Sequence, residues 1–587
     1  MIDQNLKAEM QFLLDDAFEH RSSRRTLMQR ALAIGGAAGL AYVFPRAVLG
    51  QGATPAASPA ASPVAGSAQT GLHIPDTDGD LAENQVLRLA ITEPRDMDPG
   101  VSTGYDELAI FFNIFDGLTG VDMLTGEVVP RCAESWDINA DATQYTFKIR
   151  QDLKWSNGES LNAHDFEYSW KRVMNPDTMS KYRPAMHVIK NGPAIDSETD
   201  PMDFNELGVK ASDDYTLVVD MEGPTPFFPL LTSTWTYAPV PQKVVEDKAE
   251  AWAEAENIVS NGPFKMTEWN HDQNIVLELN EHYYGEKPTI TRGEYTIFPD
   301  DSTQQYISFE NDELDIASPE GSDLERALAD AEAAKNIHTF AQSNCRFITC
   351  DAKTAPTDNA DFRRAIYAAI DRDTIANTIL KQQFVPALNV VPSDIPGNNP
   401  DATNPVGPDA AKAALAASGV DTSNFTLEYS YRVDSTTKLV AEYIEQRIPE
   451  VLGFKVKLNP IEAAAWSDYV NSRHEQPFNT KYGSWGSDFA DPSNWHNQNF
   501  VSQSDHYYLS WKNEEYDALC AKAVGEPDVE KRNELYRQAE VILVNDAAYI
   551  PVYRSLAFEA VKPYVVNLHM QPILAYVHLR YPKIAAH

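Results

Sequence analysis

Ser102 has the spacing of a hydrolase nucleophile. It lies in Gly100-Val101-Ser102-Thr103-Gly104, a Gly-x-Ser-x-Gly pattern. In hydrolases with this pattern the serine sits on a sharp turn between a strand and a helix, where it can attack an acyl carbon. Here Asp98-Pro99 precedes the pattern and favours a loop over a strand. An exported serine hydrolase is therefore the least favoured of the functions considered.

Other catalytic and metal-binding motifs are missing from the sequence. It contains no His-Glu-x-x-His, no Walker loop and no Gly-x-Gly-x-x-Gly. The 13 histidines show no ligand spacing, and the four cysteines include no Cys-x-x-Cys pair. We therefore expect no catalytic residue, no metal site and no cofactor, and we predict that the protein is not an enzyme.

Two of the cysteines, Cys345 and Cys350, lie in a stretch that is typical of a strand. Five residues of extended chain place them on opposite faces, roughly 16 Å apart, too far for a disulfide bond. The sequence therefore predicts buried free thiols.

The charge of the chain restricts its partners. Asp and Glu number 86 against 48 Lys and Arg, which gives a net charge of −38. Such a chain repels phosphate, so nucleic acid and anionic membrane surfaces are excluded as main partners. The hydrophobic fraction of 43% is ordinary for a globular protein.

The first 50 residues have the pattern of an export signal. Ser23-Arg24-Arg25-Thr26-Leu27 precedes an apolar run of about 13 residues, 31–43, which is too short to span a bilayer. The arginine pair resembles a twin-arginine signal. We expect an exported protein that is periplasmic or on the outer cell surface. Whether the signal is cleaved or stays as a membrane tether is left open.

Residues 51–83 are predicted to be a tether. Their first twenty residues are rich in Pro, Ala, Ser and Gly, a composition that cannot bury a core. We expect the folded body to begin near residue 84.

Strands and helices alternate through the rest of the chain. Period-two patterns predict strands at 87–91, 145–149 and 275–279. Period-3.6 patterns predict helices at 361–370, with Asp361 as the cap, at 437–448 and at 528–544. This alternation predicts an α/β protein.

A series of longer phrases is more specific than any single motif. In chain order they are Asp98-Pro99, 113–118 (NIFDGL), 133–136 (AESW), 145–150 (YTFKIR), 154–159 (KWSNGE), 165–170 (DFEYSW), 261–264 (NGPF), 362–372 (FRRAIYAAIDR) and 485–492 (WGSDFADP). Their order and spacing resemble the extracellular solute-binding proteins of peptide ABC importers, the oligopeptide- and dipeptide-binding family. The resemblance extends over about residues 84–570.

The resemblance implies an α/β fold of the periplasmic-binding-protein type, with two lobes that close on a ligand by a hinge. Lobe I would comprise 84–120, 262–340 and 551–587, with an extra subdomain inserted at 121–261. Lobe II would comprise 341–550. The implied partners are an oligopeptide ligand and the membrane permease subunits of an ABC transporter, and the protein would be a monomer.

The resemblance also implies a set of ligand-binding residues. Asp488 would pair with the α-ammonium of the peptide, a charge-assisted bond that ignores side-chain identity. Backbone pairing with the peptide would resemble strand addition. The candidates for that pairing, and for aromatic contacts in the cleft, are Trp485, Gly486, Ser487, Thr103, Gly104, Tyr105, Tyr182, Tyr482 and Tyr553.

Three positions depart from the family pattern. Phe489 stands where a tyrosine often follows the key aspartate, and Tyr482 and Thr437 stand where a basic residue and a histidine are expected. Recognition of the ligand's C-terminus is therefore left open. Within binding proteins, an oligosaccharide or another solute remains the alternative ligand, because cleft aromatics would stack on sugars equally well.

Overall fold

The computed structural model describes residues 71–102, 104–197, 200–299, 302–473, 477–504, 509–573 and 575–587. All of them belong to one compact unit that spans 68–587. The expected export signal, most of the expected tether and the candidate residue Thr103 lie outside the described residues. No helix within the described residues is long and apolar enough to cross a bilayer.

Lobe I is built on a four-stranded sheet. Its strands, in spatial order, are β2 (Val86–Ile91), β11 (Arg292–Ile297), β10 (Asn274–Leu279) and β9 (Phe264–Asn270). β11 runs parallel to β2, whereas β10 is antiparallel to both of its neighbours. Strands β2 and β11, which are far apart in the sequence, therefore lie side by side in this lobe.

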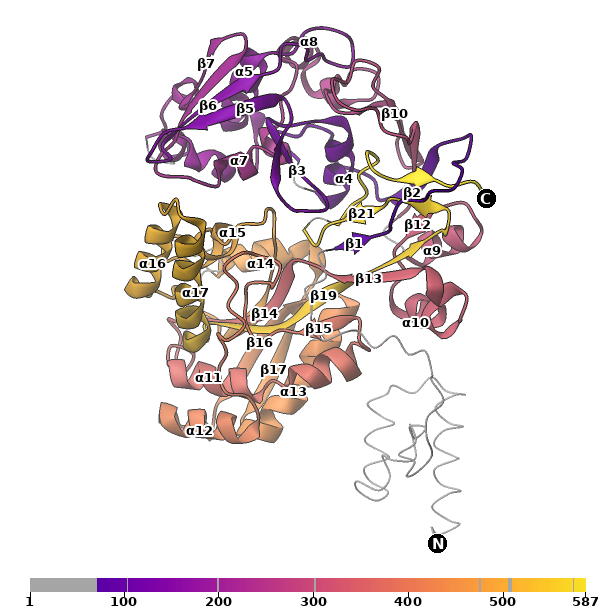
Figure 1. Cartoon of the computed structure of the whole chain (residues 1–587). Helices are drawn as coiled ribbons and strands as arrows, with labels where there is room; N and C mark the ends of the chain where they lie inside the picture. The colour runs from indigo at the N-terminus through magenta and orange to yellow at the C-terminus, as the bar shows by residue number, and fades with distance from the viewer. Residues whose placement is uncertain are drawn as a thin grey trace. The chain divides into compact units, whose positions relative to one another are not determined.

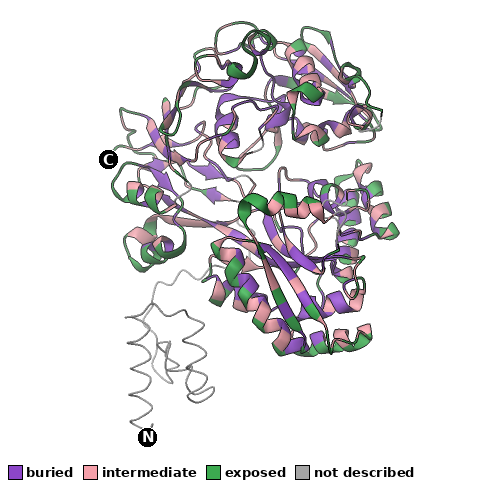
Figure 2. Cartoon of the chain, turned by 180° about the vertical axis from the view of Figure 1, so that it is seen from behind, coloured by how far each residue is buried: buried purple, intermediate pink, exposed green. Residues whose placement is uncertain are grey.

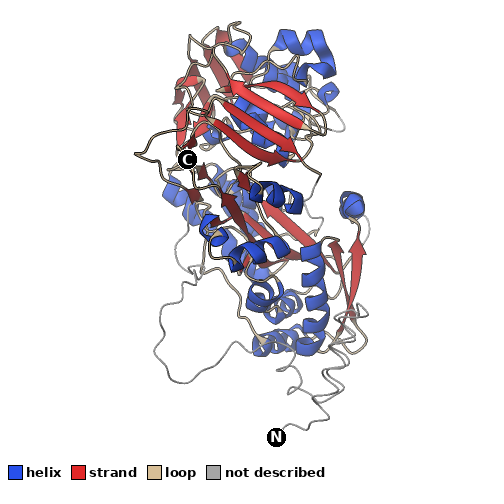
Figure 3. Ribbon diagram, turned by 90° about the vertical axis from the view of Figure 1, so that its right-hand side faces the viewer, coloured by secondary structure: helices blue, strands red, loops and turns tan. Residues whose placement is uncertain are grey.

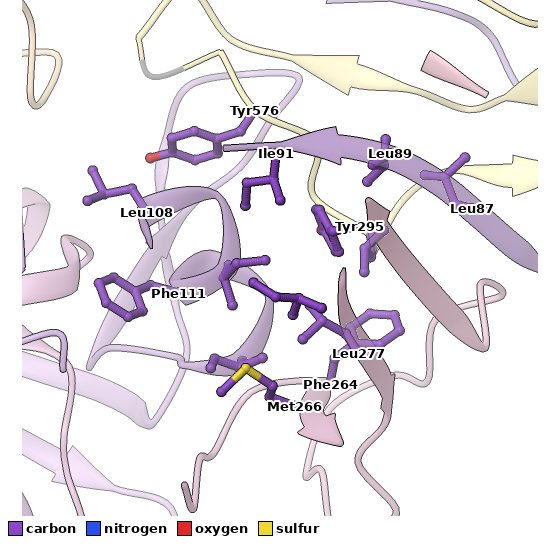
Figure 4. Close-up of a cluster of buried hydrophobic side chains, with 14 of the residues drawn as sticks. Leu87, Leu89, Ile91, Leu108, Phe111, Phe264, Met266, Leu277, Tyr295 and Tyr576 are labelled. Atoms are coloured by element: carbon purple, nitrogen blue, oxygen red, sulfur yellow. The ribbon is translucent and has the colours of Figure 1, made fainter. Parts of the chain in front are cut away.

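The core of lobe I follows from the period-two pattern of β2. Leu87, Leu89 and Ile91 are buried on one face, while the residues between them are only partly buried. Helix α4 (Tyr105–Ile114) covers that face with Leu108 and Phe111, which meet side chains from β9, β10 and β11 (Figure 4).

A subdomain is inserted between β2 and β9. Its antiparallel sheet has the order β5 (Ala133–Ile138), β6 (Gln144–Ile149), β8 (Thr216–Asp220) and β7 (Val209–Asp213). Helix α5 (Ala163–Met174) packs on it, capped by Asn162 with a capping box to Asp165. Trp170 of this helix is fully buried among Phe228 and Tyr237.

Lobe II is a sheet covered by helices on both faces (Figure 3). Its strands include β14 (Asn344–Cys350), β18 (Thr480–Gly486), β16 (Thr426–Arg432) and β17 (Lys455–Ile461). Its main helices are α11 (Ala360–Ala369), α12 (Pro408–Ser418), α13 (Ser435–Leu452), α16 (Glu514–Val524) and α17 (Val529–Asp546). Strand β14 is almost entirely buried, whereas the edge strand β17 is only partly buried and the outer helix faces are exposed (Figure 2).

The two faces of the lobe II sheet explain the cysteines. Cys345 packs into the core beside α16 and α17, whereas Cys350 packs into the core beside α11, α12 and α13. Both are buried free thiols, as are Cys132 and Cys520, so the predicted state is confirmed.

One strand runs through both lobes. β19 (Tyr549–Val561) pairs with β14 and β15 (Phe384–Pro386) of lobe II through its first half. Its second half pairs with β13 (Ile337–Ala341) and β12 (Ile316–Ala317), which pack on the core of lobe I. In Figure 1 it is the long yellow strand that leaves lobe II toward β12.

The remaining elements are short. They are β1 (Leu72–His73), β3 (Thr119–Val121), β4 (Val128–Pro130), β20 (Val565–Val566), β21 (His569–Met570), β22 (Lys583–Ile584), α6 (Gly192–Ile195), α7 (Phe228–Leu231), α8 (Gln242–Lys248), α9 (Ser302–Glu310), α10 (Gly321–Ala329), α14 (Trp466–Ser472) and α15 (Ser493–Trp495). β1 pairs with β21. Ordered structure therefore begins earlier than residue 84, the position at which we expected it to begin.

The expected elements and the observed ones agree in type. All three predicted strands and all three predicted helices are present, and the α/β class is confirmed. The cap of α11 is a correction, because Asn359, not Asp361, accepts the hydrogen bond from the amide of Phe362. Asp361 instead pairs with Arg364 on the first turn.

The packing crosses the expected subdomain boundary at one place. Trp235, Trp252 and Ile258 lie within the expected insert, 121–261, yet their side chains are buried in the core of lobe I. The segment between α7 and β9 therefore contributes side chains to the cores of both the insert and lobe I.

A buried carboxylate holds the end of α4 to the C-terminal segment. Asp116 accepts hydrogen bonds from the hydroxyls of Tyr283 and Tyr284, both at 2.8 Å, and pairs with Arg580 at 2.7 Å. Burial raises the pKa of Asp116, but Arg580, Arg131 and the two hydroxyls lower it, and the pKa lies below its ordinary value.

We expect Asp116→Asn to lower the free energy of unfolding by about 3–5 kcal/mol, because it leaves Arg580 buried without its counter-charge. Urea unfolding at pH 7 measures this, with the exposed Asp137→Asn as control, expected within about 0.5 kcal/mol of the parent. A depressed folded pKa contributes stability above about pH 4, which is lost as the pH falls, so the difference should shrink in acid. Equal stability of parent and Asp116→Asn at pH 7 would contradict the assignment.

Candidate functional site

A cavity of about 110 Å³ lies between lobe II and lobe I. From lobe II, Asp488, Phe489 and Ala490 line it, immediately after strand β18. Its other walls include Asp116, Gln571, Tyr576, His578 and Arg580 of lobe I and Arg131 of the insert. A side chain at this place can contact a ligand enclosed by both lobes.

Asp488 is a partly buried carboxylate held by neutral groups. The amide of Asn494 donates to Oδ2 at 3.1 Å, and Gln498 and the hydroxyl of Tyr182 are further hydrogen-bond partners. No ion pair to Asp488 is formed within the described residues. Burial raises its pKa above the ordinary carboxyl value, and the hydrogen bonds only partly offset this.

The loop that carries Asp488 is fixed on both sides. Ser487 donates its backbone N–H to Ser343 at 2.8 Å and accepts at its hydroxyl from the indole of Trp495 at 2.8 Å. The backbone N–H of Asp488 donates to Asn494 at 3.0 Å. The backbone N–H of Ser487 therefore pairs within lobe II, and the expected backbone contact of this residue with a ligand stays a prediction.

A buried ion pair supports the same loop from below. Asp491 accepts from the amide and hydroxyl of Ser493 at the start of α15, and pairs with Arg532 of α17 at 2.7 Å. Both partners are less than one-tenth exposed. The aspartate three residues after Asp488 therefore anchors the loop, while Asp488 itself has no counter-charge within the described residues.

Tyr182 reaches Asp488 from the inserted subdomain. It precedes the short helix Arg183–Val188, and its ring lies 5.0 Å from that of Trp235. Trp235 in turn donates its indole N–H to the backbone carbonyl of Ser102 at 3.0 Å. Ser102 is thus a buried structural residue on the loop before α4, and no histidine in the described chain hydrogen-bonds to it.

Aromatic contacts also join the lobes near Asp488. The rings of Phe489 and Phe227 are stacked with centroids 6.3 Å apart, and the guanidinium of Arg532 lies 4.8 Å from the centre of the Phe227 ring. Phe489, which replaces a tyrosine of the family pattern, therefore contacts the insert.

A second and larger cavity, about 640 Å³, brings three predicted residues together. Tyr105 lines it from lobe I and Tyr482 from lobe II, and Tyr553 lines it from the half of β19 that pairs with lobe II, although we expected lobe I to begin at residue 551. Tyr105 also donates its hydroxyl to the carbonyl of Ala575 at 2.5 Å, and its ring lies 5.6 Å from that of Tyr576. Tyr576 lines the smaller cavity, so the C-terminal segment borders both.

The other predicted residues lie at the edges of these cavities or away from them. Trp485 pairs across β14 with Cys345 and packs on the core beside α16 and α17. Gly486 is exposed at the end of β18, and a Cβ atom added to it would lie 3.9 Å from the Asn344 side chain, its nearest neighbour. Gly104 precedes α4 and accepts from the amide of Leu108.

Sequence reasoning missed several residues of the site. Asn494 and Gln498 surround Asp488, and Tyr576 lines the smaller cavity. Polar residues six and ten positions after an aspartate carry no signal of their own, and Tyr576 is distant in the chain. The described residues contain no group of three or more His, Cys, Asp or Glu arranged for a metal ion.

Comparison with known proteins gives a consistent result. Residues 127–538 match the family described as "Bacterial extracellular solute-binding proteins, family 5 Middle". The dipeptide-binding protein DppE of Bacillus subtilis is 31% identical, over 78% of this chain and 85% of its own. A probable deoxycholate-binding periplasmic protein of Escherichia coli, YgiS, is 30% identical, over 86% of this chain and 95% of its own.

The fold has solved counterparts as well. The structure of Haemophilus influenzae OppA in complex with RPPGFSPFR is similar with a TM-score of 0.70 and 27% identity. The similarity covers 86% of this chain and all of that one.

The raised pKa of Asp488 predicts an effect on the ligand-free protein. When the pKa of a carboxyl is higher in the folded state than in the unfolded state, the protein becomes less stable as the pH rises. The loss is about 1.4 kcal/mol for each unit by which the two pKa values differ. We expect Asp488→Asn to raise the Tm at pH 7 and to leave it nearly unchanged near pH 3.5, where the parent carboxyl is mostly protonated in both states. Thermal unfolding of ligand-stripped protein at the two pH values measures this.

The exposed Asp468→Asn is the control, because it removes the same charge from lobe II outside both cavities. A lower Tm for Asp488→Asn at pH 7 would show that the carboxylate stabilises the fold and would refute its assignment as an uncompensated charge.

Proposed function

This chain belongs to the family 5 bacterial extracellular solute-binding proteins, as its phrases predicted, and from that premise we propose that it is the substrate-binding component of an ABC importer for oligopeptides. The two-lobe fold with an inserted subdomain agrees with this role. Relatives named for dipeptide and oligopeptide binding support the choice of ligand. A similar chain described as the substrate-binding domain of an oligopeptide ABC transporter supports the choice of partner.

The observation that carries the proposal is the environment of Asp488. Its carboxylate lines a cavity between the lobes, is surrounded by neutral donors and has no cationic partner in the described chain. Leaving such a charge unpaired is costly, so a ligand cation that enters the cavity gains a strong, charge-assisted hydrogen bond. The α-ammonium of a peptide is a cation that every peptide supplies, whatever its side chains.

Backbone pairing along β18 would supply the rest of a sequence-independent site. β16 pairs with β18 at Tyr429↔Thr480 and Ser430↔Lys481, at the start of the strand. The end of β18, toward Gly486, lies beside the cavities. A peptide strand that follows this end would exchange main-chain hydrogen bonds and leave its side chains in the two cavities.

Contacts between the lobes suggest how ligand binding would change the form of the protein that meets the transporter. Tyr182 and Asp488, Phe227 and Phe489, and the ion pair of Lys381 with Glu325 all join opposite sides of the cleft. A ligand held by both lobes would favour a closed arrangement in which these contacts form, and the closed form would dock on the membrane permease. The protein would act as a monomer, exported to the periplasm or the outer cell surface by its twin-arginine-like signal.

The experiment is a calorimetric titration of the protein, stripped of co-purified ligand, with a pool of tri- to pentapeptides and with the same pool N-acetylated. We expect binding of the free pool and no binding of the acetylated pool. Asp488→Asn should weaken binding of the free pool by about 2–3 kcal/mol, since the ammonium loses its charged partner, while Asp468→Asn should bind as the parent does.

Three outcomes separate the alternatives. Equal binding of both pools would refute the Asp488–ammonium pair and keep the peptide. Binding of neither would move the ligand to an oligosaccharide or another solute, as the deoxycholate-binding name of one relative illustrates. Turnover of ester or peptide probes that Ser102→Ala abolishes would favour the serine hydrolase.

A further inference from the structure

The larger cavity contains a cation without a counter-ion among the described residues. Arg346 lies on β14 and lines the cavity together with Tyr482 and Tyr553. The strand register places it opposite Ser484 of β18 and Tyr553 of β19, so its side chain shares their face of the sheet. No ion pair to Arg346 is formed within the part of the chain that the structure describes.

Most of the other ionisable groups around this cavity have partners of their own. Lys381 pairs with Glu325, and Arg432 pairs with Asp434 at 3.5 Å. Glu559 accepts a hydrogen bond from Ser318 at 2.8 Å, and burial raises its pKa to about 8, so it is mostly neutral at pH 7. Glu320 also lines the cavity, and Arg346 faces it as a cation with no ion-pair partner among the described residues.

A helix end adds to the same potential. Ser435, Thr436 and Thr437, the first residues of the 18-residue helix α13, line the cavity beside Arg346. The positive end of the helix dipole favours an anion there, although Asp434 already caps the amide of Thr437. Thr437 and Tyr482 are also the two positions where the sequence lacks the basic groups of the family pattern.

We infer that Arg346 binds a carboxylate of the ligand, and with it sets the direction in which the ligand lies. The inference rests on the proposed function, because it takes a peptide whose α-ammonium is at Asp488. A guanidinium and a carboxylate can form two parallel hydrogen bonds, and such a pair is favoured at a partly buried cavity wall of this kind. The ligand's C-terminus supplies this carboxylate, or an acidic side chain does.

The spacing of the two charges limits the length of the ligand. Ser484, opposite Arg346, precedes Asp488 by four residues along the chain, a span of at most about 14 Å. An extended peptide with its ends at the two charges would have about three to five residues. Longer peptides would bind more weakly unless their ends leave the cavity.

The test uses tetra-alanine with a free C-terminus, its C-terminal amide, and an amidated tetrapeptide whose last residue is glutamate. Each has a free N-terminus, and each is titrated into the ligand-stripped parent, Arg346→Gln, Arg346→Lys and Arg432→Gln. The last variant removes an arginine that lines the same cavity but is already paired.

We expect the parent to bind the free acid about ten- to a hundredfold more tightly than the amide, from the strength of a charge-assisted bond. Arg346→Gln should lose that preference, Arg346→Lys should keep part of it and Arg432→Gln all of it. Recovery of tight binding by the glutamate amide would assign the carboxylate to a side chain, and its absence would assign it to the C-terminus.

Equal affinity of the parent for acid and amide would overturn the inference while leaving peptide binding intact, and so would an unchanged preference in Arg346→Gln. Binding of none of the three peptides by the parent would overturn the proposed function together with the inference. The comparison of acid and amide in the parent needs no variant, so a folding defect in Arg346→Gln would not prevent the test.

Discussion

The pairing of β19 is the constraint on which the two-lobe arrangement depends. The strand is continuous from Tyr549 to Val561, and its hydrogen-bond partners change from lobe II to lobe I within it. At the change, Ser555 accepts from the amide of Gln342 and donates its own amide to the side chain of Asn344. The lobes are thus joined by backbone that must stay paired, and motion between them is limited to bending and twisting of this ribbon.

The charged groups around the cleft occur in two environments, paired within the core or facing a cavity. Asp116 and Asp491 are buried beside Arg580 and Arg532, and these pairs hold the walls of the cleft in place. Asp488 and Arg346 face the cavities without such partners among the described residues. A folded chain retains uncompensated charges at a cost in stability, and that cost is recovered only when an oppositely charged group arrives. This difference distinguishes structural residues from candidate ligand-binding residues more clearly than the sequence patterns do.

The phrases along the chain predicted the fold class, the family and the loop that carries Asp488, because they reflect local turns and strand patterns. Other features depend on tertiary packing and left no local signal. The burial of Trp235 and Trp252 in lobe I, from within the expected insert, depends on which core lies nearest. Arg346 lies in a stretch whose pattern predicted only a strand with two cysteines, and its proposed role depends on Tyr482 and Tyr553, which the fold brings to the same cavity.

The pairing of β1 with β21 has a mechanical consequence. His73 stacks on His569 at 4.5 Å, and Leu72 is buried in the core of lobe I, so the chain that precedes Gly71 joins the molecule at that lobe. A pull on that chain would be borne by lobe I and would bypass the ribbon of β13, β14 and β19. Lobe II could then move by the same bending and twisting of that ribbon, and its closing would require the same work whether the protein is anchored or diffusing.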